Sequence, residues 1–202
     1  PNTTDDKKNC WGQNAVLMAA RYIRPSVKIL NLLLDFGGNP NSTECGMTKD
    51  NLGNDIKASS FALYEAVFID FEKVKLLIAK GADVNYQTDT TKGGAAQAAF
   101  YTDRMDILYY LITHGYNVHS KFSELNLSDN STIDVDICHK LRYSIFPIDS
   151  FQYKYKLLII KELSKRGIDY RSSKIPESAI DIIKNDEQLY RSIGFENYLK
   201  TY

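Results

Sequence analysis

The chain has 202 residues, of which 44% are hydrophobic and 25% are charged, a composition typical of a globular protein and not of a disordered one. Lys and Arg number 25, as do Asp and Glu, so the formal net charge is zero. A balanced charge argues against a dedicated nucleic-acid or membrane-surface binder, because neutralising phosphates requires a surplus of Lys and Arg. We therefore expect neither nucleic acid nor a membrane among its partners.

No apolar run approaches the roughly 18 residues that a membrane span needs. The longest, residues 157–160, is expected in a helix core. Residues 1–9 are polar and lack the apolar segment of a signal peptide. Because Pro1 stands where a Met would be, either the Met has been removed or the chain is a piece of a longer protein.

The three cysteines, Cys10, Cys45 and Cys138, are odd in number and unrelated in spacing. They imply no disulfide framework and favour a reducing, cytoplasmic setting.

Four segments, residues 30–37, 74–81, 108–115 and 159–167, have apolar residues every three or four positions and end in Gly. This pattern predicts four helices, each followed by a glycine in the left-handed conformation, which any Cβ disfavours. A shorter, alanine-rich segment precedes three of them, at residues 15–20, 62–67 and 95–100. The small side chains predict first helices that approach their neighbours closely in a stack. Phe71 and Phe151 fall at apolar helix positions and are expected in the core.

Residues 80–85 have the sequence KGADVN, which resembles the signature that ends an ankyrin repeat. Residues 9–20 lie over the pattern that begins one, and residues 37–41, 115–119 and 167–170 resemble the ending more weakly. The Thr-Pro-Leu-His tetrapeptide of the family is nowhere intact, which implies a less regular stack. The chain is thus similar to divergent ankyrin-repeat proteins of intracellular bacteria and large viruses.

The resemblance implies an all-α fold, an ankyrin-repeat solenoid of stacked helix–turn–helix units with short β-turn fingers. We expect a single domain over residues 1–202. Its repeats are expected at about 9–41, 57–86, 89–119 and 131–170, followed by a capping unit at 173–202 and with a polar insertion loop at 38–59.

Sequence features that would indicate catalysis or metal binding are few, and we expect no catalytic residue, no metal and no cofactor. Cys138 and His139 are adjacent on an expected helix and so point about 100° apart, which is wrong for a nucleophile and its base. We expect Cys138 in the core with Ile137, Leu141 and Ile145, and His139 in solvent. Gly93-Gly94 lacks the Lys-Ser or Lys-Thr of a phosphate-binding loop.

The concave-face positions of the family, carried onto this chain, are the expected partner-binding residues: Trp11, Gln13, Arg21, Tyr22, Lys57, Ser60, Phe68, Ile69, Thr90, Thr91, Tyr101 and Thr102. Trp, Tyr and Arg dominate binding hot spots, so an exposed set of this kind predicts a protein partner. The alternative interpretation places Trp11 and Phe68 against the first helix or a preceding repeat, and both interpretations stay open.

We therefore expect a monomeric, non-enzymatic scaffold that binds a partner protein on its concave face. By analogy it would be a host-directed effector, which would place it in the host cytoplasm. One alternative is the targeting region of a longer enzyme whose catalytic domain is absent from this chain. Another is an enzyme site in loop 38–59, which carries Glu44, Cys45, Lys49 and Asp50.

Residues 140–174 contain nine Lys or Arg and three Asp or Glu. We expect these charges on the solvated side of one long helix, where an acidic partner could also bind.

Overall fold

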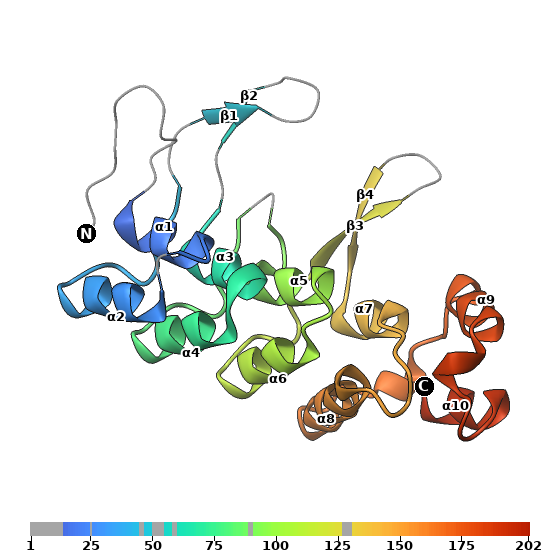
Figure 1. The fold of residues 1–202 in the computed structure, drawn as a ribbon. Coiled ribbons are helices and arrows are strands. Elements are labelled where there is room, and N and C mark those ends of the chain that lie inside the picture. The colour runs from blue at the N-terminus through green and yellow to red at the C-terminus, as the bar shows by residue number, and fades with distance from the viewer. Residues whose placement is uncertain are drawn as a thin grey trace. The chain divides into compact units, whose positions relative to one another are not determined.

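The computed structural model describes residues 14–24, 26–44, 47–49, 55–57, 60–88, 91–126 and 131–202. This part of the chain is mainly α-helical, with ten α-helices and two antiparallel two-stranded hairpins (Figure 1). The expectation of a mainly α-helical chain is therefore confirmed. None of the described helices is long and apolar enough to cross a bilayer.

Residue contacts divide the chain into two compact units, Pro1–Thr102 and Asp103–Tyr202, and each is described by itself. The expected single domain over 1–202 stays a prediction.

The first unit contains α1 (Ala15–Arg21), α2 (Val27–Asp35), β1 (Met47–Lys49), β2 (Asp55–Lys57), α3 (Ala62–Ile69), α4 (Phe71–Ala79) and α5 (Gly94–Tyr101). The second contains α6 (Met105–Thr113), β3 (Phe122–Asn126), β4 (Ser131–Val135), α7 (Ile137–Tyr143), α8 (Phe151–Lys165), the 3-10 helix η1 (Tyr170–Ser172), α9 (Glu177–Asn185), the 3-10 helix η2 (Glu187–Leu189) and α10 (Phe195–Thr201).

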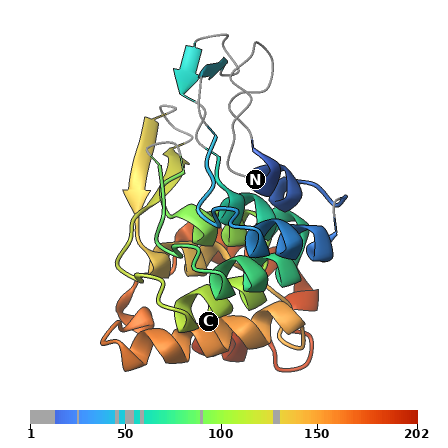
Figure 2. The same cartoon turned by 90° about the vertical axis from the view of Figure 1, so that its left-hand side faces the viewer.

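Helices of the first unit pack in consecutive pairs. Helix α1 packs against α2 and α3 against α4, while α3 also lies between α1 and α5, and α2 lies beside α4 (Figure 2). Helices α1, α3 and α5 each bury alanines completely, among them Ala19, Ala66 and Ala98, and such small side chains allow the close approach that the sequence predicts.

Two sets of hydrogen bonds join neighbouring helix pairs of the first unit. The buried ammonium of Lys73 in α4 donates to the carbonyls of Ala19 (2.7 Å) and Tyr22 (2.5 Å) at the end of α1. Burial lowers the pKa of Lys73, although nearby Asp70 acts in the opposite direction. In the loops, the Asn41 amide donates to the Gly81 carbonyl (3.2 Å) and accepts from the backbone N–H of Asp83 (2.6 Å).

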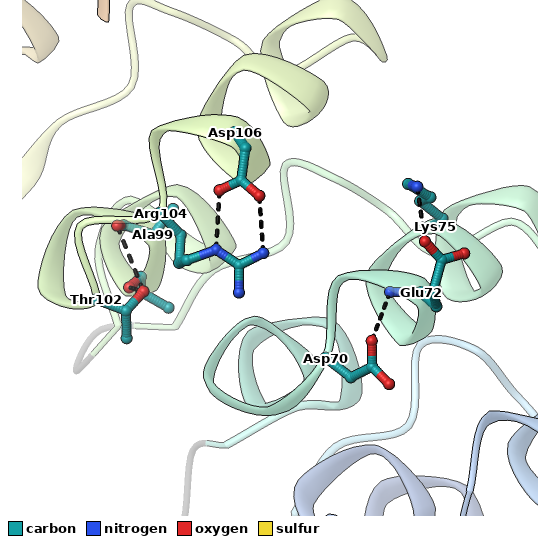
Figure 3. Close-up of polar contacts among 8 residues, drawn as sticks. Asp70, Glu72, Lys75, Ala99, Thr102, Arg104 and Asp106 are labelled. Carbon is teal, nitrogen blue, oxygen red and sulfur yellow. Dashed lines mark hydrogen bonds and ion pairs between the residues drawn. The ribbon is translucent and has the colours of Figure 1, made fainter. Parts of the chain in front are cut away.

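Capping contacts within the first unit explain where α4 begins and α5 ends (Figure 3). The Asp70 carboxylate accepts from the Glu72 N–H (2.9 Å) at the start of α4, and Lys75 pairs with Glu72 (2.8 Å) one turn later. At the end of α5 the Thr102 hydroxyl donates to the carbonyl of Ala98 (2.9 Å), which helps satisfy the last turn.

At the start of the second unit, Arg104 binds the Asp106 carboxylate through two nitrogens, at 2.9 and 2.8 Å (Figure 3). Burial by itself would raise the pKa of Asp106, but this bidentate contact outweighs it and lowers the pKa. Helix α6 then packs against α8.

The β3–β4 hairpin extends away from α7 (Figure 1) and is longer than the β-turn fingers we expected. Its register pairs Phe122 with Val135 at the base, where both are buried. Glu124 of β3 contacts the ring of His139 (3.3 Å) and the ammonium of Lys140 (3.0 Å), which joins the hairpin to α7. Burial would raise the pKa of Glu124, but these two contacts lower it.

The segment expected as a capping unit, residues 173–202, is helical and contains α9, η2 and α10. The chain forms η2, turns at Gly194 with φ +80°, and then forms α10. Tyrosine hydroxyls attach α10 to the rest of the unit: Tyr198 donates to the Phe146 carbonyl (2.6 Å) and Tyr153 to the Thr201 hydroxyl (2.6 Å).

Two expectations for residues 140–174 are wrong. The segment is not one long helix, because α7 ends at Tyr143 and Pro147 lies between α7 and α8. Phe151 and Leu157, expected in the core, are 57% and 43% exposed. The reason is that α8 buries the opposite face, on which Ile159 and Leu163 lie.

The four helix-terminating glycines are confirmed in the left-handed region. Gly37, Gly81, Gly115 and Gly167 have φ values of +83°, +91°, +99° and +78° and follow α2, α4, α6 and α8. A side chain would be disfavoured at each, since this conformation brings Cβ close to the following carbonyl.

We expect Gly81→Val and Gly115→Val each to lower the free energy of unfolding by about 1–2 kcal/mol or more, because a β-branched residue is poorly tolerated in this conformation. Urea unfolding would measure the change. Ala79→Val, which places a valine at an exposed position of α4, serves as the control. We expect it to lower the free energy of unfolding by less than the glycine variants do. Glycine variants as stable as the control would contradict the cap conformation.

Candidate partner-binding surface

Aromatic side chains are exposed where the first helices of the first unit end. Tyr22 follows α1, Phe68 lies in the last turn of α3 and Tyr101 ends α5, with exposed fractions of 46%, 44% and 62%. Helices α1, α3 and α5 are neighbours, and Lys73, just after α3, reaches the end of α1. We call the four aromatic residues Tyr22, Tyr64, Phe68 and Tyr101 the aromatic row.

The rings in the centre of the aromatic row support one another. Tyr64 contacts Phe68 edge to face at 5.3 Å between centroids, and its other neighbour is buried Phe61 at 5.5 Å. Burial raises the pKa of Tyr64, with smaller contributions from Tyr101 and Glu65. The Tyr64 hydroxyl therefore stays protonated at neutral pH. Anchored rings lose little freedom on binding, which favours affinity.

Arg21, one of the predicted partner-binding residues, is instead part of an internal ionic cluster. Its guanidinium lies 2.5 Å from Glu44 and 3.0 Å from Glu65, and its side chain is only 17% exposed. Ser60, also predicted, donates its hydroxyl to Glu65. Both side chains therefore bind carboxylates within the protein.

This ionic cluster closes the base of the 38–59 insertion. Glu44 donates its N–H to the Ser60 carbonyl (2.8 Å), and Ala62 donates its N–H to the Ser42 carbonyl (2.9 Å), so the chain on either side of the insertion meets in a single antiparallel bridge between Thr43 and Phe61. Glu44 therefore has structural contacts with Arg21 and Ser60. The side chains of Cys45, Lys49 and Asp50, the other residues considered for an enzyme site, lie outside the described part of the chain.

The remaining predicted residues are placed unevenly. Ile69 is half-buried, and half-buried Thr102 is occupied in capping α5. Thr91 is only 8% exposed, and its hydroxyl contacts that of Thr88 (2.6 Å). Four further predicted residues lie outside the part of the chain whose side chains the structure describes: Trp11, Gln13, Lys57 and Thr90.

Sequence reasoning missed Tyr64, although a signal was present. Tyr64 and Phe68 are four residues apart on one helix and therefore share a face. This spacing is visible in the sequence and could have identified Tyr64.

The structure offers no support for chemistry at Cys138. The thiol is buried beside Ile137 and Leu141, and burial, with Asp136 contributing, raises its pKa, whereas a nucleophilic cysteine needs a lowered one. His139 is partly exposed, as expected, but contacts Glu124. Within the described ranges, no group of three His, Cys, Asp or Glu side chains could hold a metal ion.

Comparison with models of known protein families finds no match, and no curated protein is significantly similar in sequence. Assignment to a family therefore depends on the residues and the helix packing alone.

Proposed function

We propose that this chain is a divergent ankyrin-repeat scaffold that binds a partner protein through the aromatic row. Support for the repeat assignment comes from helices that end in left-handed glycines and from pairs that pack on consecutive pairs in the first unit. The Asn41 contacts with Gly81 and Asp83 join corresponding loops of neighbouring pairs, as a stack of similar units requires.

The observation that carries the binding proposal is that Phe68 and Tyr101 are both exposed and lie on neighbouring helices, α3 and α5. Each large aromatic side chain leaves apolar area in water, and burying that area against a partner is favourable. Helices α3 and α5 are packed elements, so these side chains are presented from a rigid support.

The test is to select binders to the full chain from a phage-displayed random peptide library and to measure their affinity by fluorescence anisotropy. We expect Phe68→Ala/Tyr101→Ala to weaken the selected peptides by about 30-fold or more, which corresponds to about 2 kcal/mol. The melting temperature should change little, because both side chains are exposed.

A matched control removes one Phe and one Tyr that are exposed elsewhere, in Phe36→Ala/Tyr143→Ala. This variant should bind the selected peptides like the wild-type protein. If the two double variants bind equally well, the aromatic row is not the site. If Phe68→Ala/Tyr101→Ala unfolds early, those rings support the fold and the proposal fails.

We further propose that the scaffold acts as a monomer in a reducing cytoplasm, that of a host cell if it is exported as an effector. Support comes from Cys138, which is buried as a free thiol.

A further inference from the structure

Helix α8 in the second unit presents a second surface of distinct chemistry. It buries Tyr153, Lys156, Ile159 and Leu163. Its opposite side, which we call the α8 outer face, is exposed and consists of Phe151, Lys154, Leu157, Leu158, Lys161 and Lys165. These positions share one side because the helix repeats every 3.6 residues.

The apolar part of the α8 outer face is substantial. Phe151, Leu157 and Leu158 are 57%, 43% and 40% exposed. The Phe151 ring packs on Tyr155 at 4.6 Å, which in turn contacts Tyr109 of α6 at 5.7 Å. Phe151 is therefore held in place by its neighbours, as the anchor of an interface usually is.

The charged part of the α8 outer face is entirely basic. Lys154 and Lys161 form no ion pair with any described residue, while Lys165 pairs with Glu162 in its own turn (2.6 Å). Glu162 is only 18% exposed, so α8 presents no exposed carboxylate. Lys161 lies about 10 Å along the axis from Lys154 and about 6 Å from Lys165, from the rise of 1.5 Å per residue.

We propose that the α8 outer face binds an acidic amphipathic helix of a partner protein. Carboxylates on that helix would meet Lys154, Lys161 and Lys165, while its apolar residues would cover Phe151, Leu157 and Leu158. Charge complementarity supports this occupant, and the lysine spacing corresponds to two turns and one turn of a facing helix. This surface lies in the second unit and does not depend on the aromatic row.

An acidic helix fits the α8 outer face better than a lipid bilayer does. Membrane-surface helices separate an apolar face from a charged one, so that the apolar face alone enters the acyl region. Here Leu157 and Leu158 lie between Lys154 and Lys161 on the same side of α8. Insertion of the leucines would bring the lysines with them, whereas a partner helix can match the two kinds of residue one by one.

The experiment measures the binding of fluorescein-labelled designed peptides of about 15 residues, long enough for four helical turns, to the full chain by anisotropy. One peptide carries Glu and Leu on a single helical face, a second replaces Leu by Ala, and a third replaces Glu by Lys. We expect the Glu/Leu peptide to bind at least about tenfold more tightly than either analogue, because both charge and apolar contacts contribute.

The test variant is Lys154→Glu/Lys161→Glu, and the control is Lys174→Glu/Lys184→Glu, which makes the same change of net charge at exposed positions outside α8. The test variant should weaken the Glu/Leu peptide at least about tenfold and the control less than about twofold, with unchanged melting for both. Equal loss in both variants would overturn the proposal, because it would show attraction by net charge alone.

Three other results would also overturn the proposal: no binding of the Glu/Leu peptide, equal binding of its Ala analogue, or selective binding to phosphatidylserine vesicles instead of the peptide. Sedimentation of the wild-type chain as a dimer that Lys154→Glu/Lys161→Glu dissociates would assign the α8 outer face to a second copy instead.

Discussion

Replacing Lys156 by Met is expected to stabilise the protein, by about 1–4 kcal/mol at slightly acidic pH, as substitutions of buried charges by apolar side chains can do. Lys156 is 1% exposed in α8, and its charged neighbour Arg142 is also a buried cation. The ammonium donates to the Ser144 carbonyl (2.9 Å) and lies 3.7 Å from the Tyr202 ring centroid. These two contacts offset only part of the cost of removing the charge from water.

The effect of Lys156→Met should depend on pH with a definite sign. Burial, and secondarily Arg142, lower the pKa of Lys156 well below its ordinary value. Between the folded and unfolded pKa values the unfolded chain binds an extra proton, so this lysine makes wild-type stability rise with pH. The Met variant lacks that term. Its advantage should therefore be largest in acid and shrink as the pH approaches the ordinary lysine range.

Urea unfolding of both proteins at acidic and at mildly alkaline pH would test this. Lys161→Met, on the exposed side of α8, is the control and should show little effect at either pH. A destabilised Lys156→Met with no dependence on pH would mean that the contacts with Ser144 and Tyr202 outweigh the burial of charge.

Gly94→Ala is expected to destabilise the first unit by about 3 kcal/mol or more, the largest loss we predict for a single methyl group. Gly94, the first residue of α5, has φ +54°, and a Cβ there would lie 2.3 Å from the Tyr86 carbonyl oxygen. The left-handed conformation costs about 1–2 kcal/mol by itself. The clash adds to this, because its partner is a backbone atom that cannot move aside without its loop.

Gly81→Ala separates the two effects. Gly81 also has a positive φ, of +91°, but a Cβ there would meet no atom within 4 Å. It should therefore cost only the conformational term, about 1–2 kcal/mol. Urea unfolding of the two alanine variants gives the contribution of the Tyr86 contact by difference. Equal losses would show that this close approach is not a feature of the folded chain.

Local features of this protein follow from the sequence alone. The second helix of each pair and the left-handed glycine after it were predicted at Gly37, Gly81, Gly115 and Gly167 because helix period and glycine conformation are properties of a short segment. The alanine-rich first helices were predictable for the same reason, and so was the burial of Cys138 on an apolar helix face.

The candidate surface was only partly predictable. Tyr22, Phe68 and Tyr101 are exposed, as the family pattern implied, but the same pattern also selected Arg21 and Thr91. Arg21 instead forms an ion pair with Glu44. Glu44 follows α2 in the sequence and lies in the 38–59 insertion. Such a pairing leaves no periodic trace in the sequence.

Tertiary packing decided which side of a helix meets water. In α8, apolar residues and lysines occur all round, so the sequence could not tell that Lys156 would be buried while Phe151 and Leu157 would be exposed. That choice depends on α6, η1 and the tyrosines of the C-terminal helices, which surround one side only. Helix formation is set by near neighbours in the chain, whereas burial is set by residues distant in sequence, and the two proposed surfaces depend on burial.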